Sequence, residues 1–190
     1  YQIHRWDDDT PIEETLATLD DAVRRGDVRY IGASSMWAHQ LAEALHTSER
    51  EGYERFVTMQ NLYNLAYREE EREMVPLCEK KDVGMIPWST IGAGYLARPY
   101  EQDDATTRGE HETEIGRPYR EGGGEEINRR VQELADEKGV KMAQIALRWV
   151  AGKDVVDAPI VGTSSVEHLE DAVEALDIDL SESDVEWLEE

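Results

Sequence analysis

The sequence has few of the residues that cross-link small proteins or bind metals, beginning with a single cysteine in 190 residues. One cysteine excludes an internal disulfide, and Cys78 lies on the apolar stripe of a predicted helix, which favours a buried structural thiol over a reactive one. The histidines beyond the N-terminal segment are scattered: His39, His46, His111 and His168. No Cys/His cluster has the spacing of a zinc site, so metal catalysis has little support and no metal is expected.

Long apolar runs and several common motifs are also missing. No apolar run approaches the roughly 18 residues that a membrane-spanning helix needs, although 39% of the residues are hydrophobic. The chain contains no G-x-G-x-x-G turn, no P-loop and no G-x-S-x-G nucleophile motif. Because no secretory signal precedes Tyr1 either, we expect a soluble cytoplasmic protein with a single domain over 1–190.

Positive charge is scarce as well. The chain has 43 acidic and 20 basic residues, which gives a formal charge of −23. Such a field repels nucleic acid and anionic membranes, so neither is an expected partner. The acids are spread over helix faces and loops without the ligand spacing of a calcium loop, and they predict a solvated acidic surface adapted to high salt. The alternative is an ordinary acidic mesophilic protein.

The first half of the chain repeats a strand and a helix. Candidate strands begin 27 residues apart, at Gln2, Arg29, Phe56 and Val83. Helical patterns lie between them, ending at Gly26, near Gly52 and, for the third, spanning about 69–81. The first helix is predicted to start at a Thr10-x-x-Glu13 capping box with Pro11 at its first position. Alternation of this kind predicts parallel strands with right-handed crossovers.

The second half begins with a polar insertion over 100–124, too long for an ordinary connection and predicted to be a mobile loop over a site or a partly disordered segment. Helices over 125–138 and 142–151 and a fifth strand over 157–165 follow. The next helix is predicted to be capped by Ser164-x-x-Glu167, with Leu169, Val173 and Leu176 on its apolar stripe, and a short helix closes the chain.

Five units at nearly constant spacing predict an α/β fold of the (β/α)8 TIM-barrel type rather than a doubly wound sheet. The chain would supply strands 4–8 of that barrel, and the three preceding units would add roughly 80 to 120 residues. In such a barrel the carboxyl ends of the strands form the working face.

Polar or aromatic residues stand at all five predicted strand ends. They are His4 and Arg5, Ser34 and Ser35, Gln60 and Asn61, Trp88 and Ser89, and Gly162 with Thr163 and Ser164. A lone histidine is often only hydrogen-bonded, and Ser or Thr before a helix is usually a cap. Their convergence nevertheless favours a polar, planar ligand such as a carboxamide. The stretches "STIGAG" and "GTSSVEHL" resemble phosphate-binding turns, with simple connectors as the alternative.

Five stretches resemble, in this order, the C-terminal five-eighths of the aldo-keto reductases: "YQIHRWD", "VRYIGASS", "MQNLYNLAYREEE", "MIPWSTIGAGYLARP" and "PIVGTSSVEHLEDAVEALDIDLSESDVEWLEE". The nearest similarity is to the bacterial and archaeal branch related to potassium-channel β subunits. The resemblance implies a barrel of the aldo-keto reductase type that reduces aldehydes or ketones to alcohols by hydride transfer from NADPH, with NADH use left open. In that family a Tyr, a Lys, an Asp and a His carry the chemistry; His4 matches the His, and the other three would lie upstream of Tyr1.

The resemblance also implies a cofactor site. Ser34, Ser35 and Gln60 would hold the carboxamide, and Trp88 would stack on the nicotinamide. The pyrophosphate would meet Ser89, Ile91, Gly92 and Arg98, and the adenosine 2′-phosphate end would meet Gly162, Thr163, Ser164, His168, Asp171 and Ala172. Arg5 and Trp6 would line the substrate pocket.

Three hypotheses follow from these residues. The first is an NADP(H)-dependent oxidoreductase that acts on a small carbonyl compound. The second is a catalytically inactive nucleotide-binding module that lacks the Tyr, Lys and Asp. The third is self-association of the chain through open barrel edges. No Lys or Arg stands beside Thr163, so the 2′-phosphate is expected to be bound mainly by hydroxyls and helix N–H groups, and bound more weakly.

Overall fold

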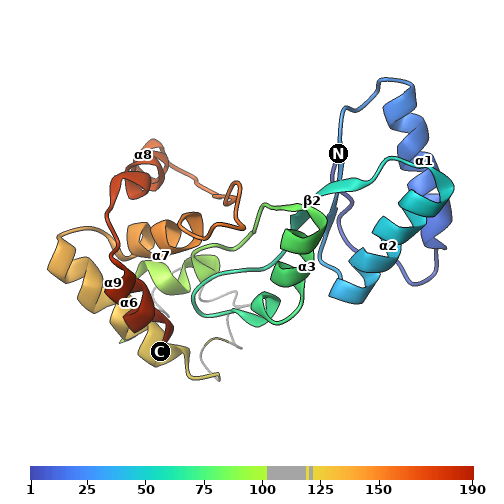
Figure 1. Cartoon of the computed structure of the whole chain (residues 1–190). Helices are drawn as coiled ribbons and strands as arrows, with labels where there is room; N and C mark the ends of the chain where they lie inside the picture. The colour runs from blue at the N-terminus through green and yellow to red at the C-terminus, as the bar shows by residue number, and fades with distance from the viewer. Residues whose placement is uncertain (102–118, 120–121) are drawn as a thin grey trace. The chain divides into compact units, whose positions relative to one another are not determined.

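The computed structural model describes residues 1–101, 119 and 122–190, and it divides them into two compact units (Figure 1). The first unit comprises 1–62 and 69–87, and the second comprises 63–68 and 88–190. The single domain expected over 1–190 stays a prediction, and most of the insertion predicted over 100–124 lies outside the described residues. None of the described helices has the length and apolar character that crossing a membrane requires.

The first unit has the predicted alternation of strands and helices. Its elements are α1 (Ile12–Arg24), β1 (Ile31–Ser34), α2 (Ala38–Glu51), β2 (Phe56–Gln60), a 3-10 turn η1 (Glu69–Glu71), α3 (Met74–Lys81) and β3 (Gly84–Met85). The sheet has the order β1-β2-β3, and both pairings are parallel. Consecutive strands are therefore neighbours joined by a helical crossover, which confirms the repeat predicted from the spacing.

The strand predicted at Gln2 is reduced to an isolated parallel bridge between Gln2 and Gly32. Ile3 N–H donates to Gly32 O at 3.0 Å, and Gly32 N–H donates to Tyr1 O at 2.8 Å. A Cβ at Gly32 would overlap the side chains of Gln2 and Thr58, which hydrogen-bond to each other across it. A side chain at residue 32 would therefore have to displace the hydrogen-bonded Gln2 and Thr58 side chains.

The capping box predicted for the first helix is wrong. The helix begins at Ile12 after Pro11 and has no side-chain cap. The Thr10 hydroxyl donates instead to the Asp7 carboxylate at 2.7 Å, and the same carboxylate accepts from Asp9 N–H at 3.1 Å. A local turn closed by Asp7 has therefore taken the side chain that the sequence pattern assigned to the helix.

The helix predicted over 69–81 is divided into η1 and α3. Cys78, on α3, is fully buried, as predicted. Burial, with smaller contributions from the charges of Glu70 and Glu79, raises the pKa of its thiol to about 12. The thiol therefore stays protonated and acts as a small apolar core group.

The second unit is mainly helical among its described residues. Its elements are η2 (Gly92–Ala97), α6 (Gly124–Lys138), α7 (Met142–Ala151), α8 (Val166–Glu174), η4 (Ala175–Asp177) and α9 (Glu182–Glu189). Trp149 of α7 lies at the centre of the core, with its ring centroid 5.4 Å from that of Tyr63. The helices predicted over 125–138 and 142–151 are confirmed to within one residue.

Two local predictions for the segment before α8 are wrong. No strand forms over 157–165 in the part of the chain that the structure describes, and the hydrogen bonds found there are to a side chain or within the local turn. Thr90 Oγ1 donates to Ile160 O at 3.2 Å, and Thr163 Oγ1 donates to Ser165 O at 2.7 Å. The cap of α8 is Ser165 rather than Ser164, since Ser165 Oγ accepts from His168 N–H at 3.2 Å.

The apolar stripe predicted on α8 exists but is not buried in this unit. Leu169, Val173 and Leu176 are 51%, 60% and 59% exposed, and Val166 is 71% exposed. Val166, Leu169 and Val173 lie on α8 and Leu176 lies on the following turn η4, and such a row of exposed apolar side chains is unusual for a solvated surface. The apolar stripe predicted from the helical period is thus present, and its side chains are largely exposed.

Candidate functional site

The first unit brings together three of the residues predicted to bind a carboxamide. The register of β1 and β2 pairs Ser34 with Gln60, so both stand at the carboxyl ends of neighbouring strands. Ser34 Oγ donates to Gln60 O at 2.8 Å, and Ser35 N–H donates to the same carbonyl at 3.2 Å. Ser35 has a φ of 49°, and its hydroxyl oxygen lies 3.3 Å from that of Ser34. Two hydroxyls and one side-chain amide thus share a single edge of the sheet.

His4 follows the N-terminal bridge in the same unit. It lies two residues beyond Gln2, as Ser34 lies two residues beyond Gly32, the bridge partner of Gln2. His4 and Arg5 are exposed and Trp6 is half-buried. Their predicted roles, catalysis for His4 and substrate binding for the other two, stay predictions.

A partly buried carboxyl group next to this edge, that of Glu70, was missed in the sequence. Asn61 follows β2 and is buried, and its Nδ2 lies 2.5 Å from Glu70 Oε2. Burial raises the pKa of Glu70 to about 7, opposed by the Asn61 hydrogen bond and assisted by the charge of Glu69. The run Glu69-Glu70-Glu71 reads as a solvated acidic turn, and only the fold shows that its middle member is enclosed.

The second unit contains a cavity of about 530 Å³, here named the η2–α8 cavity. Its wall is formed by three segments: Ile91, Ala93, Gly94, Ala97 and Arg98; Lys141, Ala143, Gln144 and Leu147; and Val161, Gly162, Thr163, Ser164, His168, Asp171 and Ala172. Eight predicted cofactor residues are among them: Ile91, Arg98, Gly162, Thr163, Ser164, His168, Asp171 and Ala172. Ser89, Gly92 and Trp88 belong to the same unit but do not line the cavity.

The loop from Ser89 to Gly94 is held in a left-handed conformation by its own hydrogen bonds. Ser89, Gly92, Ala93 and Gly94 have φ values of 55°, 60°, 56° and 99°. Gly92 N–H donates to Ser89 O, Ala93 N–H to Ser89 Oγ and Gly94 N–H to Ile91 O, at 2.8, 3.1 and 3.0 Å. These three donors, on which a pyrophosphate was expected to rest, are used within the loop. The loop is thus preformed. A pyrophosphate would contact its backbone surface and side chains, because these three N–H groups are already hydrogen-bonded.

Two contacts place Arg98 on the cavity wall. A Cβ at Gly94 would lie 2.7 Å from Arg98 Nη2, so the guanidinium rests directly on the glycine backbone. Buried Asn128, on α6, donates from Nδ2 to Tyr95 O at 2.5 Å and to Arg98 O at 3.0 Å. The main chain that carries the arginine is therefore anchored to a helix, which favours a fixed cation at this wall.

The opposite wall carries an ion-pair cluster that joins α7 to α8. Lys141 Nζ lies 2.7 Å from Asp171 Oδ2 and 3.0 Å from Glu167 Oε1. Hydrogen bonds to Asp171 and then to Glu167 raise the pKa of Lys141. Gln144 Nε2 donates to Asp171 O at 3.1 Å, and its Oε1 accepts from Lys141 N–H at 3.0 Å. Sequence reasoning missed Lys141, because a lysine before a helix carries no motif.

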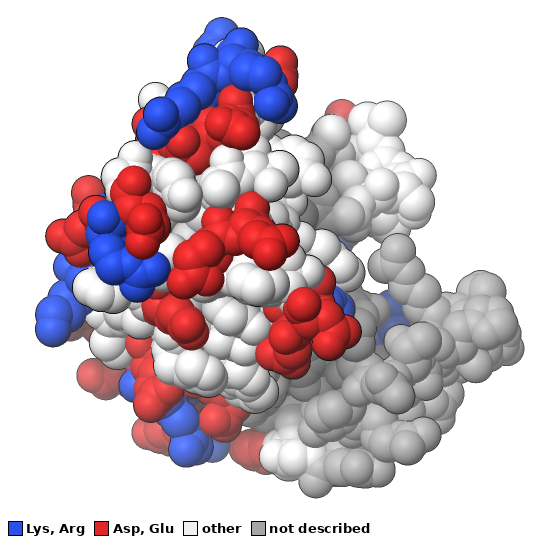
Figure 2. All heavy atoms as spheres, turned by 90° about the vertical axis from the view of Figure 1, so that its right-hand side faces the viewer, with Lys and Arg blue, Asp and Glu red and all other residues white. Residues whose placement is uncertain are grey.

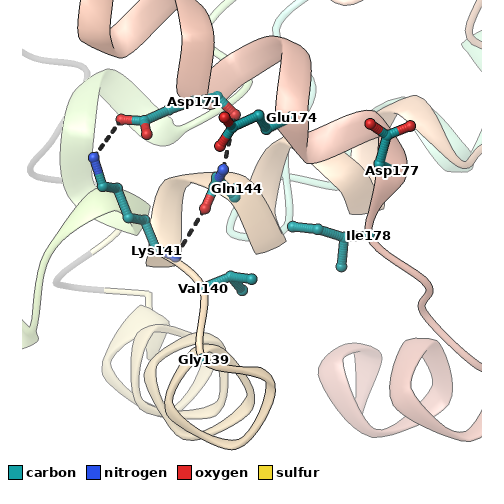
Figure 3. A pocket seen from close by; sticks show the side chains of 8 residues that line it. All are labelled: Gly139, Val140, Lys141, Gln144, Asp171, Glu174, Asp177 and Ile178. Atoms are coloured by element: carbon teal, nitrogen blue, oxygen red, sulfur yellow. Dashed lines mark hydrogen bonds and ion pairs between the residues drawn. The ribbon is translucent and has the colours of Figure 1, made fainter.

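Figure 3 shows a second pocket lined by residues of this cluster, with Lys141 extending toward Asp171. This pocket, also of about 530 Å³, is lined by Gly139, Val140, Lys141, Gln144, Asp171, Glu174, Asp177 and Ile178. Lys141, Gln144 and Asp171 line both spaces. The hydrogen-bonded, charged side chain of Lys141 therefore borders both spaces.

The family to which the chain belongs follows from its similarity to known proteins. The model of the aldo/keto reductase family matches residues 1–190. The chain belongs to the aldo/keto reductase family. It is 45% identical over 188 residues to an aldo-keto reductase of Alternaria alternata, which covers 99% of this chain and 50% of the relative. It is 44% identical over 194 residues to a putative aryl-alcohol dehydrogenase of Schizosaccharomyces pombe, covering 100% of this chain and 53% of the relative.

A further relative and a solved structure agree with this assignment. Versiconal hemiacetal acetate reductase of Aspergillus parasiticus is 40% identical over 192 residues, which is 100% of this chain and 55% of that enzyme. A crystal structure of a thermostable aldo-keto reductase in complex with the inhibitor epalrestat superposes with a TM-score of 0.76 at 29% identity, covering 100% of this chain and 58% of that one. The aldo/keto reductase chain thus spans about half the length of the curated relatives it matches, and it has an α/β fold of the TIM-barrel type.

Proposed function

We propose that this aldo/keto reductase chain is part of an oxidoreductase that reduces aldehydes or ketones to alcohols with a nicotinamide cofactor, by preference NADPH. The observation that carries the proposal is the η2–α8 cavity, where eight residues predicted for the cofactor from sequence line one space. The relatives named as a dehydrogenase and a reductase support the same chemistry. We place the chain in the bacterial and archaeal branch of the family that is related to the potassium-channel β subunits, because its sequence stretches resemble that branch.

The residues present fit the two ends of a dinucleotide. In the first unit, the Ser34 hydroxyl has lone pairs left to accept from a carboxamide NH2 after donating to Gln60 O, and the Gln60 side chain offers both a donor and an acceptor. In the second unit, the cavity has the size of a typical ligand pocket and contains Arg98 and the hydroxyls of Thr163 and Ser164. We assign the carboxamide to the first set and the phosphates and adenosine to the second.

The proposed reaction needs a hydride and a proton at the carbonyl. Bound nicotinamide would supply the hydride. We assign His4 to orienting the carbonyl oxygen, Trp88 to the face of the nicotinamide ring, and Arg5 and Trp6 to the rim of the substrate pocket. The proton donor in this assignment is a Tyr tuned by a Lys and an Asp, for which these 190 residues have no matching positions. Turnover by the chain alone is therefore not expected, and the whole enzyme is expected to show it.

One experiment tests the proposal and its alternative, a nucleotide-binding module without catalysis. The 190-residue chain is titrated with NADPH and NADH by nicotinamide fluorescence, and consumption of each is followed with a panel of aldehydes and ketones. Saturable binding without turnover fits the assignment, and turnover by a longer chain that contains a Tyr, a Lys and an Asp would then complete it. Failure to bind either nucleotide would refute the proposed function.

We further infer that the enzyme works in a salt-rich cytoplasm. The face in Figure 2 carries Asp and Glu side chains in several groups, with Lys and Arg side chains among them, rather than one acidic patch. Repulsion within a chain of charge −23 is relieved by screening, which supports adaptation to high salt. Self-association through open barrel edges also stays a proposal, and sedimentation at two protein concentrations tests it directly.

A further inference from the structure

Lys141 stands where the proposed cofactor site has a deficit of positive charge. A 2′-phosphate carries about two negative charges and is normally met by cations and strong donors. The segment from Gly162 to Ala172 contributes no Lys or Arg to the η2–α8 cavity. The other wall contributes Arg98, which rests on Gly94.

We propose that Lys141 supplies the cation that recognises the 2′-phosphate of NADPH, and that its partner Glu167 moderates the strength of that recognition. The inference rests on the proposed function and deepens it, since it names the residue that sets the preference between NADPH and NADH. It assigns the role to the residue that precedes α7, an element distant in sequence from the Thr163 turn.

The position of the ammonium group supports this assignment. Lys141 lines the η2–α8 cavity together with Thr163, Ser164 and His168. Its Nζ is held by Glu167, in the first turn of α8, and by Asp171, in the next turn. The charge is therefore fixed beside the start of the helix that follows the Thr163 turn, where the resemblance places the 2′-phosphate.

The hydrogen-bonding capacity of Lys141 leaves room for a ligand. An ammonium group has three N–H donors, and the two carboxylates account for two of them. The side chain is about half exposed, at 53%, so a phosphate oxygen can approach the third donor. The two carboxylates keep the lysine extended before a ligand arrives, which lowers the entropy cost of binding.

The same carboxylates limit how much positive charge a phosphate meets. The Asp171 side chain is mostly covered, at 17% exposure, and its backbone carbonyl accepts a hydrogen bond from Gln144. Asp171 therefore helps to hold the cluster together. Glu167 is 75% exposed and contributes only its charge and one hydrogen bond to Lys141. Neutralising Glu167 should therefore strengthen phosphate binding without disturbing the packing of α8.

The test uses two ligands, 2′,5′-ADP and 5′-AMP, that differ only in the 2′-phosphate. Calorimetry measures the affinity of the 190-residue chain for 2′,5′-ADP and for 5′-AMP at fixed ionic strength, and fluorescence repeats the comparison with NADPH and NADH. For Lys141→Gln we expect about a tenfold loss of 2′,5′-ADP affinity and less than about a twofold change for 5′-AMP. Lys141→Arg should keep most of the affinity, and Glu167→Gln should raise it about two- to threefold.

Lys153→Gln is the matched control. Lys153 also lies next to α7, is paired with Glu189 and does not line the cavity, so its loss should leave the ratio of the two affinities unchanged. A Lys141→Gln variant that binds 2′,5′-ADP as the parent does, with an unchanged melting temperature, would overturn the inference while leaving the proposed function intact. A parent chain that binds neither 5′-AMP, NADPH nor NADH would overturn the proposed function and the inference together.

Discussion

Glu70 gives the sharpest prediction about stability, because it is an acid enclosed beside Asn61 at the end of β2. Burial raises the pKa of Glu70 from an ordinary value of 4.5 to about 7. The folded state therefore holds the proton more tightly than the unfolded state does. The contribution of protonated Glu70 to the stability of the folded state is fully present below about pH 4.5. It is lost as the pH rises through about 7, where the folded protein also loses this proton.

The magnitude follows from the same shift. Going from 4.5 to about 7 corresponds to a free-energy difference of roughly 3 kcal/mol at most. Glu70 is only partly buried, so solvent screening reduces this to about 1–2 kcal/mol. Glu70→Gln keeps an oxygen that can accept from Asn61 but has no proton to lose. We expect it to stabilise the protein by about 1–2 kcal/mol at pH 8.5 and by less than half as much at pH 5.5.

Urea unfolding of both proteins at pH 5.5 and 8.5, in the same salt, measures these differences. Glu73→Gln is the control, because Glu73 lies close in sequence and is exposed but does not contribute to the shift of Glu70, so its substitution should change the free energy of unfolding far less at pH 8.5. Equal stabilities of the Glu70→Gln variant and the parent at pH 8.5 would refute the reasoning. A stabilisation by Glu70→Gln that is larger at pH 5.5 than at pH 8.5 would refute it equally, because the sign of the pH dependence would then be reversed.

Three further predictions concern backbone positions and salt. Gly32→Ala should lower the free energy of unfolding by roughly 1–3 kcal/mol, since its Cβ overlaps Gln2 and Thr58, and a loss below about 0.5 kcal/mol in urea would contradict this. Gly94→Ala should weaken NADPH binding several-fold by displacing the Arg98 guanidinium from the loop. Gly52→Ala, also at a positive φ but in open space and outside the cavity lining, should not weaken it, and equal effects in the titration would argue against the prediction. The melting temperature should rise between about 0.1 and 1 M KCl as screening relieves the charge of −23, and a flat profile over this range would contradict the proposed salt adaptation.

Helix positions in this chain were predictable where the apolar period and a helix-ending residue such as glycine agree. For α6, an apolar period is followed by Gly139, which adopts the left-handed conformation with a φ of 68° that ends the helix. Where two residues satisfy the same rule, sequence alone cannot choose. Ser164 and Ser165 both precede α8, and Ser165 becomes the cap because Thr163 forms a turn with it.

The candidate site was predictable to a different extent in its two parts. Hydroxyls and glycines at strand ends are visible as a pattern, and the structure brings Ser34 together with Gln60 through the register of neighbouring strands. Lys141 and Glu70 carry no pattern, because each gains its surroundings from an element far away or from burial. Groups defined by tertiary enclosure rather than by sequence neighbours are those that a motif cannot reveal.

The residues assigned to the cofactor are divided between the two units, and Trp88, assigned to the nicotinamide ring, belongs to the second. The η2–α8 cavity is built wholly within the second unit, whereas His4 and the Ser34–Gln60 pair belong to the first. Binding at the proposed adenosine end can therefore be measured separately from turnover. Binding of 2′,5′-ADP reports on the cavity alone, and only the difference between NADPH and 2′,5′-ADP reports on the nicotinamide end. This difference, rather than turnover, is the quantity that shows whether both ends of the proposed site act on one cofactor.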